Sequence, residues 1–328
     1  MLPAKLQPGN QVRILSPAIS LSAISQTVIS NAVARLTALG LKVTFAQHAK
    51  EVDELSSSSV KSRLNDLHTA FANPEVKAII TTLGGYNSNQ LLNGLDYQLI
   101  AQNPKILVGY SDITALAAAI YAKTGLVTYS GPHFSTFGME KGFTYIHNYF
   151  LQCLFSSEPY SITPSAHWSN DEWYIDQQNR TFYPNEGYWI LQSGNAQGIC
   201  IGGNLCTLNL LQGTPFMPNL TNAILFLEDD SLSNPNIFDR DLQSLLHLPQ
   251  AQSIKGLVVG RFEKASGMRL PLLKHIINTK PQLKNIPIIA NADFGHTTPF
   301  FTFPIGGQVS ISATQQGEVS IGFSQHVG

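Results

Sequence analysis

The sequence predicts an α/β protein built on largely parallel sheets, and three observations indicate this class. The strand-like runs are continuously apolar, as at 106–108 and 223–227, which is typical of strands buried on both faces. Segments with helical spacing of apolar residues separate these runs. The chain has 328 residues, of which 43% are hydrophobic and only 12% charged, so it can bury a sizeable core and has too little charge for a disordered chain.

The first half of the chain alternates strands with helices. Its expected elements are a strand over 12–18, a helix over 30–40 closed by Gly40, a strand over 41–46, a helix within 58–74, strands over 76–85 and 106–109, and a helix from Asp112. A second alternating section begins later. It comprises strands over 198–203, 223–228, 254–262 and 286–291, helices over 204–212, 238–248 and 271–280, and a final hairpin-like run over 303–322.

The composition changes between about 156 and 198, where the chain is polar, aromatic-rich and weakly periodic. This stretch contains all three tryptophans of the protein, Trp168, Trp173 and Trp189. The expected division is an N-terminal α/β domain over 1–160, an aromatic-rich connecting loop over 161–195 and a C-terminal β/α domain over 196–328.

Charge and cysteine content exclude several classes of protein. The net charge is −1 and the sequence pI is about 6.7, so no basic face for nucleic acid is expected. Three cysteines without a CxxC pair predict reduced thiols and no structural zinc site. No stretch has the length of a signal peptide or a membrane span, which predicts a soluble, cytoplasmic protein.

Ligands of open α/β sheets gather beyond the carboxyl ends of the strands, so the residues at those ends are candidates for chemistry. Ser111 follows one strand and precedes a helix. It could cap that helix, or it could be a nucleophile on a sharp strand-to-helix turn, although GYSD lacks the G-x-S-x-G pattern. Gly84 and Gly85 could form a simple turn, or they could bring free N–H groups close to a ligand.

An acid and a histidine stand at two further strand ends. Glu228 could orient a histidine; Asp229 and Asp230 are rivals, but Glu228 is nearest the strand. His296, between Gly295 and Thr297, could be a structural histidine of its loop, or it could take a proton from the serine. The pattern predicts a serine hydrolase.

Several ordered motifs resemble the LD-carboxypeptidase (muramoyltetrapeptide carboxypeptidase) family of serine peptidases. They are LGGYNSNQLL, GYSDITAL, GGNLCTLNLLQGT, ILFLEDD, FDRDLQSLLH and ADFGHTTP, and they extend over nearly the whole chain. The first of these, with GPHFSTFG and PNEGYWILQ, is similar to the microcin C self-immunity branch.

The resemblance implies a Ser111–His296–Glu228 triad and an oxyanion hole made by the backbone N–H groups of Gly85 and Asp112. It also implies a flavodoxin-like N-terminal domain and a swivelling C-terminal β/α domain, with the active site at the cleft between them. Family members are commonly cytoplasmic homodimers that need neither a metal nor another cofactor.

The resemblance leaves three functions open. The immunity branch cleaves the amide of an aminoacyl-nucleotide, the carboxypeptidase branch removes D-alanine from a murein tetrapeptide, and a binding module could keep the scaffold without turnover. Trp173 could stack on a nucleobase, or it could pack the loop between the domains. Asn87 and Asn204, at strand ends, could bind polar groups of a substrate, although both are also ordinary turn or cap residues.

Overall fold

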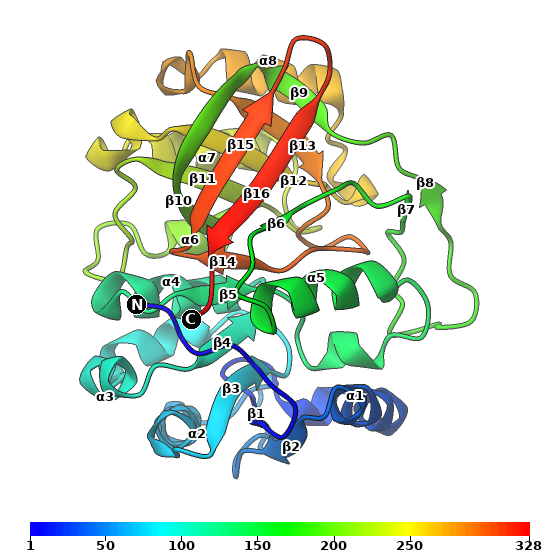
Figure 1. The fold of residues 1–328 in the computed structure, drawn as a ribbon, viewed down its shortest axis with the longest axis vertical. Coiled ribbons are helices and arrows are strands. Elements are labelled where there is room, and N and C mark those ends of the chain that lie inside the picture. Colours follow the sequence, from blue (N-terminus) through cyan, green and yellow to red (C-terminus); the bar gives the residue numbers. More distant parts are fainter.

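A six-stranded sheet organises the N-terminal part of the chain (Figure 1). The computed structural model describes all 328 residues. Its first sheet has the order β14-β5-β4-β3-β1-β2, in which the five strands from the first half run parallel in the flavodoxin-like order. The strands are β1 (Gln11–Leu15), β2 (Lys42–Phe45), β3 (Val76–Thr81), β4 (Ile106–Gly109), β5 (Thr128–Ser130) and β14 (Phe303–Ile305).

Four helices connect the first five of these strands, and a fifth helix follows β5. They are α1 (Gln26–Ala38), α2 (Val60–Ala72), α3 (Tyr97–Gln102), α4 (Ile113–Thr124) and α5 (Thr144–Leu154). Ser25 caps α1 and Ser59 caps α2, each by accepting a hydrogen bond from a backbone N–H group in the first turn of its helix. In contrast to the half-exposed α1 and α2, α4 is buried on every side from Ile113 to Ile120, because its alanines allow β10 and α6 of the second region to pack closely against it.

The second region contains an eight-stranded sheet of order β6-β16-β15-β10-β11-β12-β13-β9. Its strands are β6 (Tyr160–Ser161), β9 (Trp189–Gln192), β10 (Gly194–Asn204), β11 (Ala223–Glu228), β12 (Gly256–Gly260), β13 (Ile288–Ala292), β15 (Gln308–Ala313) and β16 (Val319–Gln325). The helices are α6 (Leu205–Asn209), α7 (Pro235–Leu246) and α8 (Leu270–Asn278), and β7 (His167–Trp168) pairs with β8 (Tyr183–Pro184) in a separate ribbon. The predicted fold class, a parallel-sheet N-terminal region followed by a second sheet, is confirmed.

Six short 3-10 helices complete the secondary structure. They span Leu21–Ala23, Ser88–Gly94, Ser135–Gly138, Pro249–Ser253, Lys264–Ser266 and Pro281–Leu283. The model contains no helix with both the length and the apolar character that a membrane crossing requires.

The two sheets exchange segments. The run over 303–322 is not one hairpin: β15 and β16 pair with each other, whereas β14 leaves them and pairs antiparallel with β5 of the first sheet. The chain turns between β14 and β15 at Gly306, where φ is +91° and an added Cβ would lie 2.1 Å from the Tyr121 ring. Conversely, β6 and β9, from around and within the predicted connecting loop, extend the second sheet.

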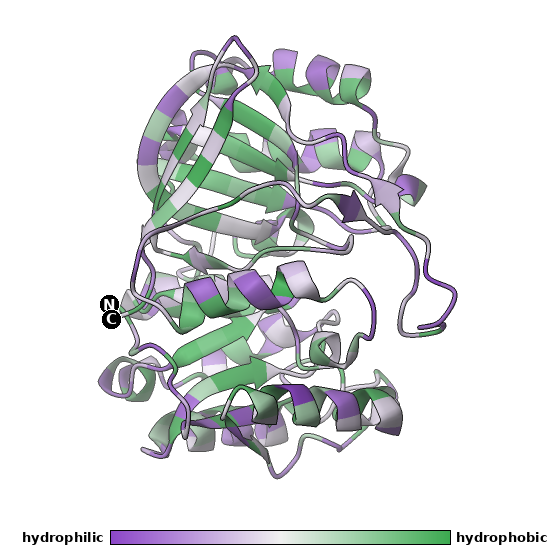
Figure 2. Ribbon diagram, turned by 45° about the vertical axis from the view of Figure 1, so that its right-hand side comes forward, coloured by the Kyte–Doolittle hydropathy of each residue, from purple (hydrophilic) through white to green (hydrophobic).

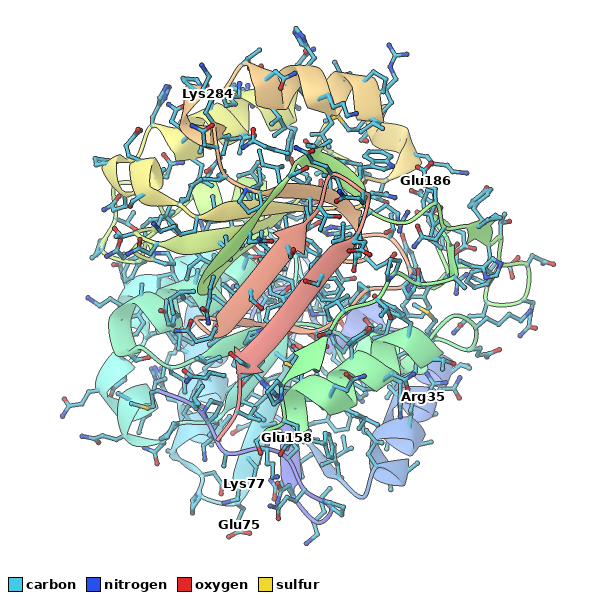
Figure 3. All side chains as sticks on the ribbon, turned by 45° about the horizontal axis from the view of Figure 1, so that its top comes forward. Arg35, Glu75, Lys77, Glu158, Glu186 and Lys284 are labelled. Atoms are coloured by element: carbon cyan, nitrogen blue, oxygen red, sulfur yellow. The ribbon has the colours of Figure 1, made fainter.

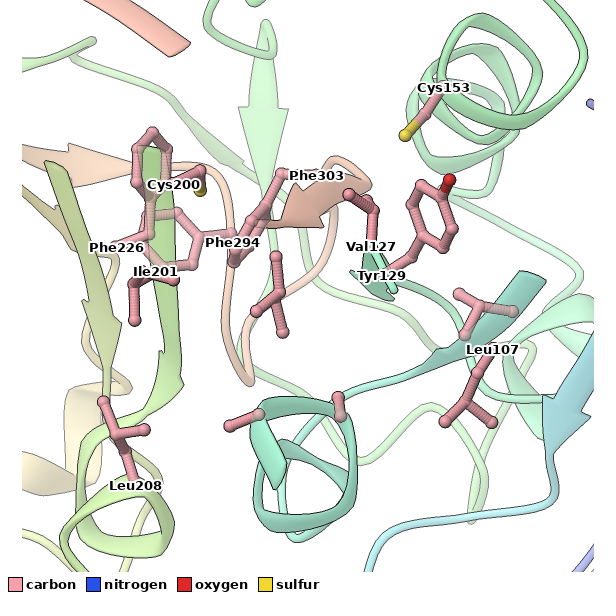
Figure 4. Packing of buried hydrophobic residues seen from close by; sticks show 14 of the residues in the cluster. Leu107, Val127, Tyr129, Cys153, Cys200, Ile201, Leu208, Phe226, Phe294 and Phe303 are labelled. Carbon is pink, nitrogen blue, oxygen red and sulfur yellow. The ribbon is translucent and has the colours of Figure 1, made fainter. Parts of the chain in front are cut away.

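One hydrophobic core joins both sheets. Phe303 of β14 packs against Phe226 and Phe294 of the second region, at ring distances of 5.2 and 5.3 Å, while its own strand pairs with β5 (Figure 4). A single contiguous cluster of 84 buried residues contains all of these side chains, so neither sheet has a core of its own. Figure 2 shows the same pattern as hydrophobic colour along the inner strands of both sheets.

Charged side chains lie mainly on the outside. Figure 3 labels examples that the structure leaves exposed: Glu75, Lys77, Glu158, Glu186 and Lys284. The two chain ends meet on one side of the molecule (Figure 1). The Gly328 amide donates to the Pro3 carbonyl at 2.8 Å, and the Lys5 amide donates to the Gly328 carbonyl at 3.1 Å.

We expect Phe303→Ala to lower the free energy of unfolding by about 3–5 kcal/mol, the usual cost of removing a buried aromatic ring. Because Phe303 is fully buried between the sheets, unfolding should remain a single transition. Denaturant titration followed by tryptophan fluorescence and circular dichroism measures both. Leu55→Ala, at a side chain that is 70% exposed, is the control and should change stability by less than about 0.5 kcal/mol. Two separate transitions in the wild type would contradict a shared core.

Candidate active site

Ser111 stands on a tight turn between β4 and α4. Its φ is +60°, a conformation that few residues other than glycine adopt. Gly84 makes room for it, because a Cβ there would lie 2.9 Å from Ser111 Cβ and 3.1 Å from its Oγ. Gly109, at the end of β4, lets that strand pack closely, since a Cβ there would lie 2.3 Å from Thr81 Oγ1. Ser111 does not cap the helix, because Asp112 occupies the N-cap position. Its hydroxyl is therefore available for another partner.

That partner is His296. The imidazole Nε2 lies 3.0 Å from Ser111 Oγ, and Nδ1 lies 2.7 Å from Glu228 Oε2. The carboxylate accepts, so Nδ1 carries the proton and Nε2 of the neutral ring can accept from the hydroxyl. Gly295 permits this approach, because a Cβ there would lie 2.7 Å from the same carboxylate oxygen. The structure thus brings together Ser111, His296 and Glu228, which the sequence analysis identified as candidates at three strand ends.

Acidic side chains control the ionisation of His296. Burial alone would lower the pKa of this imidazole, but the Glu228 carboxylate, assisted by Asp230 and Glu263, outweighs burial and raises the pKa to about 9. Below that pH the protonated form predominates, whereas a general base must be neutral. Glu228, which orients the imidazole ring of His296, therefore also keeps that ring protonated up to a higher pH.

Glu228 is the acid that contacts His296; its two rivals take other positions. Asp229 is 2% exposed, and burial raises the pKa of its carboxyl to about 7, with Glu228 and Asp230 adding to the effect. Asp230 accepts the Leu232 amide and acts on His296 only through its charge. No group of three or more His, Cys, Asp or Glu side chains is arranged to hold a metal ion.

Two residues that the sequence analysis missed, Tyr110 and His133, form a stack of rings that packs against His296. The Tyr110 ring packs against His296 at 5.4 Å and stacks on His133 at 4.3 Å. His133 Nδ1 lies 2.8 Å from Thr81 Oγ1, and complete burial, helped by the charge of His296, lowers the pKa of His133 to about 3, so this ring stays neutral. The sequence feature that could have identified Tyr110 is its position directly before Ser111.

The two amides expected to form the oxyanion hole lie near the hydroxyl. An added Cβ on Gly84 would be 3.5 Å from the Asp112 nitrogen, which places the 84–85 segment beside the start of α4. Gly85 has a φ of +151°, and neither its amide nor that of Asp112 donates to an acceptor within the protein. The N-terminal end of α4 adds a partial positive charge here.

The three residues expected to bind substrate have different surroundings. Asn87 accepts from Arg63 and Ser57 through its side-chain oxygen, so it is part of the protein's own hydrogen-bond network. Asn204 caps α6 by accepting from Thr207, while its Nδ2 is buried without a partner. All three remain predictions as ligand contacts.

The third of these residues, Trp173, is half-buried in the connecting loop and packs edge-to-face on Tyr174 at 6.0 Å. That loop approaches the site: the Asn170 side chain accepts the Lys264 amide at 2.7 Å, next to Glu263. The charge of Tyr174 also helps burial raise the pKa of Tyr110.

A hydroxyl, an imidazole and a carboxylate in one hydrogen-bonded chain, beside two free amides, is the site geometry of serine hydrolases. Comparison with known protein families supports the same class of enzyme. Residues 12–131 match the LD-carboxypeptidase N-terminal domain, and residues 197–311 match the LD-carboxypeptidase C-terminal domain. The chain belongs to the LD-carboxypeptidase family of serine peptidases.

Individual relatives fall in both branches of this family. YocD of Bacillus subtilis (strain 168), provisionally named a carboxypeptidase, is 56% identical over 95% of this chain and 96% of its own. The microcin C7 self-immunity protein MccF of Escherichia coli is 32% identical over 95% and 93%. A protein of Bacillus subtilis (strain 168) provisionally named a murein peptide carboxypeptidase is 30% identical over 97% and 93%.

Solved structures with the same fold include an MccF-like protein from Bacillus anthracis str. Ames, with a TM-score of 0.98, 56% identity and coverage of 99% of this chain and 100% of that one. MccF in complex with aspartyl sulfamoyl adenosine has a TM-score of 0.89 and 30% identity, with full coverage of both chains. A Trp-to-Phe mutant of MccF in complex with adenosine monophosphate has a TM-score of 0.88 and 30% identity, again over both whole chains.

Glu228→Gln should lower the pKa of His296, because it removes the main charge that holds the proton. In the wild type, NMR titration of the His296 ring should give a midpoint near 9 rather than near 6.5. Because the folded pKa is the higher value, the protonated ring stabilises the fold below about pH 6.5, and this contribution is lost as the pH rises through about 9. Asp96→Ala, at the N-cap of α3, is the control. An unchanged midpoint in Glu228→Gln would contradict the assignment.

Proposed function

We propose that this protein hydrolyses the amide bond of aminoacyl- or peptidyl-nucleotides, as in microcin C-type self-immunity or detoxification, through an acyl-enzyme on Ser111. The observation that carries the proposal is the single imidazole that reaches Ser111 at 3.0 Å and Glu228 at 2.7 Å from opposite ring nitrogens. The solved MccF structures with bound aminoacyl sulfamoyl nucleosides, which share this fold, favour a nucleotide-linked substrate.

The mechanism follows from the geometry. Neutral His296 takes the proton from Ser111 as Oγ attacks the amide carbonyl, and Glu228 stabilises the imidazolium that forms. The Gly85 and Asp112 amides receive the negative charge of the tetrahedral intermediate, and loss of one such donor costs about 3–4 kcal/mol in comparable sites. His296 then protonates the leaving nitrogen, and water releases the acyl group from Ser111.

The connecting loop would supply the nucleobase contact. Trp173 is the candidate, since it is half-buried in a loop tied to the Glu263–Lys264 segment beside His296. Asn87 and Asn204 are the candidates for polar contacts to the substrate. We place the site at the cleft between the two regions, and the protein in the cytoplasm as a homodimer without metal or cofactor.

Removal of D-alanine from a murein tetrapeptide is the second candidate function. Its support is the relative named for murein peptides, together with a murein tetrapeptide carboxypeptidase of Pseudomonas aeruginosa that is 34% identical over 40% of this chain. The same triad would serve, since both reactions transfer an acyl group from an amide.

We expect the wild type to release the amino acid from an aminoacyl sulfamoyl adenosine, and Ser111→Ala to lower kcat by at least about 10³-fold without loss of fold. Chromatography of the products measures turnover, and murein tetrapeptide is run in parallel. Ser135→Ala, at another buried serine, serves as the control. Release of D-alanine alone would favour the second candidate, and turnover by Ser111→Ala would contradict both.

Trp173→Ala should raise KM for the nucleotide substrate about 5- to 100-fold with little change in kcat, since stacking contributes about 1–3 kcal/mol per base. Trp173→Phe keeps an aromatic face and should retain most of the affinity. Initial-rate kinetics against the same substrate distinguish the two variants. Equal KM values for Trp173→Ala and the wild type would exclude this residue as the stacking surface.

A further inference from the structure

The segment of residues 84–88, here called the glycine loop, is fastened to the start of α4 by one carboxylate. Asp112 Oδ2 accepts the amides of Asn87 at 3.1 Å and Ser88 at 2.9 Å. In return, the Ser88 hydroxyl donates to the Asp112 carbonyl at 2.7 Å. Asp112 is 3% exposed and Ser88 is fully buried, so water does not compete for these contacts.

Arg63 of α2 holds the same loop from its other side. Its Nη1 donates to the Asn87 carbonyl at 3.0 Å, to Asn87 Oδ1 at 3.1 Å and to the Pro17 carbonyl at 3.0 Å, while its Nη2 donates to Gln90 Oε1 at 2.6 Å. The guanidinium is 2% exposed. A planar, five-donor group can hold several acceptors in fixed directions, which a lysine ammonium cannot.

The remaining contacts of the loop do not use the Gly85 amide. The Gly84 carbonyl accepts from the Ile19 amide at 3.1 Å, and a Cβ on Gly85 would lie 3.0 Å from Ala18 Cβ. The Gly84 carbonyl before Gly85 and the Asn87 and Ser88 amides after it are therefore engaged, whereas the Gly85 amide has no acceptor in the protein.

Stability alone does not explain this arrangement. Burying a carboxylate and a guanidinium costs several kcal/mol per ion, and apolar replacements of such groups are often neutral or stabilising. Donors in an oxyanion hole, however, are effective only when they are fixed before the charge develops. Arg63 and the Asp112 carboxylate hold the glycine loop, which carries the Gly85 amide, in a fixed position and so meet that requirement.

We propose that Arg63 and the Asp112 side chain are positioning residues that set the separation of the Gly85 and Asp112 amides. The inference rests on the proposed function. Asp112 has two parts in it: its amide is one donor, and its carboxylate fixes the loop that carries the other. Ser88 completes the link by tying the loop back to the Asp112 carbonyl.

Three variants test this proposal with the aminoacyl sulfamoyl adenosine assay. Asp112→Ala and Arg63→Met should each lower kcat about 10- to 100-fold while KM changes less than about twofold, because the ground state does not use the oxyanion contacts. Asp112→Asn keeps an acceptor oxygen for the Asn87 and Ser88 amides and should retain kcat within about threefold. Asp96→Ala, which removes an exposed carboxylate that caps α3, is the control and should leave both constants unchanged.

Amide hydrogen exchange supplies a readout that is independent of turnover. The Asn87 and Ser88 amides should exchange slowly in the wild type and in Asp112→Asn, and faster in Asp112→Ala. Ser111-dependent turnover with wild-type kcat in both Asp112→Ala and Arg63→Met overturns the inference and leaves the proposed function standing. Absence of Ser111-dependent turnover in the wild type overturns both. Equal losses of kcat in Asp112→Ala and Asp112→Asn, with unchanged exchange, also overturn the inference.

Discussion

The pairing of β14 with β5 is the interaction on which the site depends. One row of paired residues crosses the first sheet, with Gly109 opposite Ser130 and Ser130 opposite Phe303. Gly109 ends the strand that leads to Ser111, and Phe303 begins the strand that follows the His296 loop. The sheet hydrogen bonds therefore fix the nucleophile and its base to each other, although 185 positions separate them in sequence.

The environment of His296 combines opposing effects. Burial favours an uncharged ring, while Glu228 and two further acids favour the cation, and the acids prevail. Such a ring is a strong base once it has lost its proton, and it is held in one orientation from both nitrogens. The same acids give this side of the site a negative character, whereas the amides and the helix end beside Ser111 contribute positive charge.

Local pattern was enough to find the alternation of strands and helices and the three side chains at strand ends, because ligand-binding groups gather at the carboxyl ends of parallel strands in both sheets. It could not find β14, since a three-residue strand beside a hairpin has no periodicity that distinguishes it. Nor could it find Arg63 or His133, whose contacts join segments distant in sequence. Local pattern also could not show that the Asn87 side-chain oxygen accepts a hydrogen bond from Arg63.

The hydrogen bonds between Gly328, Pro3 and Lys5 have a consequence for how the chain can be rearranged. Because Gly328 is hydrogen-bonded to Pro3 and Lys5, the chain nearly closes into a ring. The packing of the fold therefore does not depend on the point at which the chain starts. A short peptide could join the two ends without disturbing either sheet, and new ends could be opened at the tip of the β15–β16 hairpin. A partner protein fused at residue 1 or at residue 328 would be placed on the same side of the molecule.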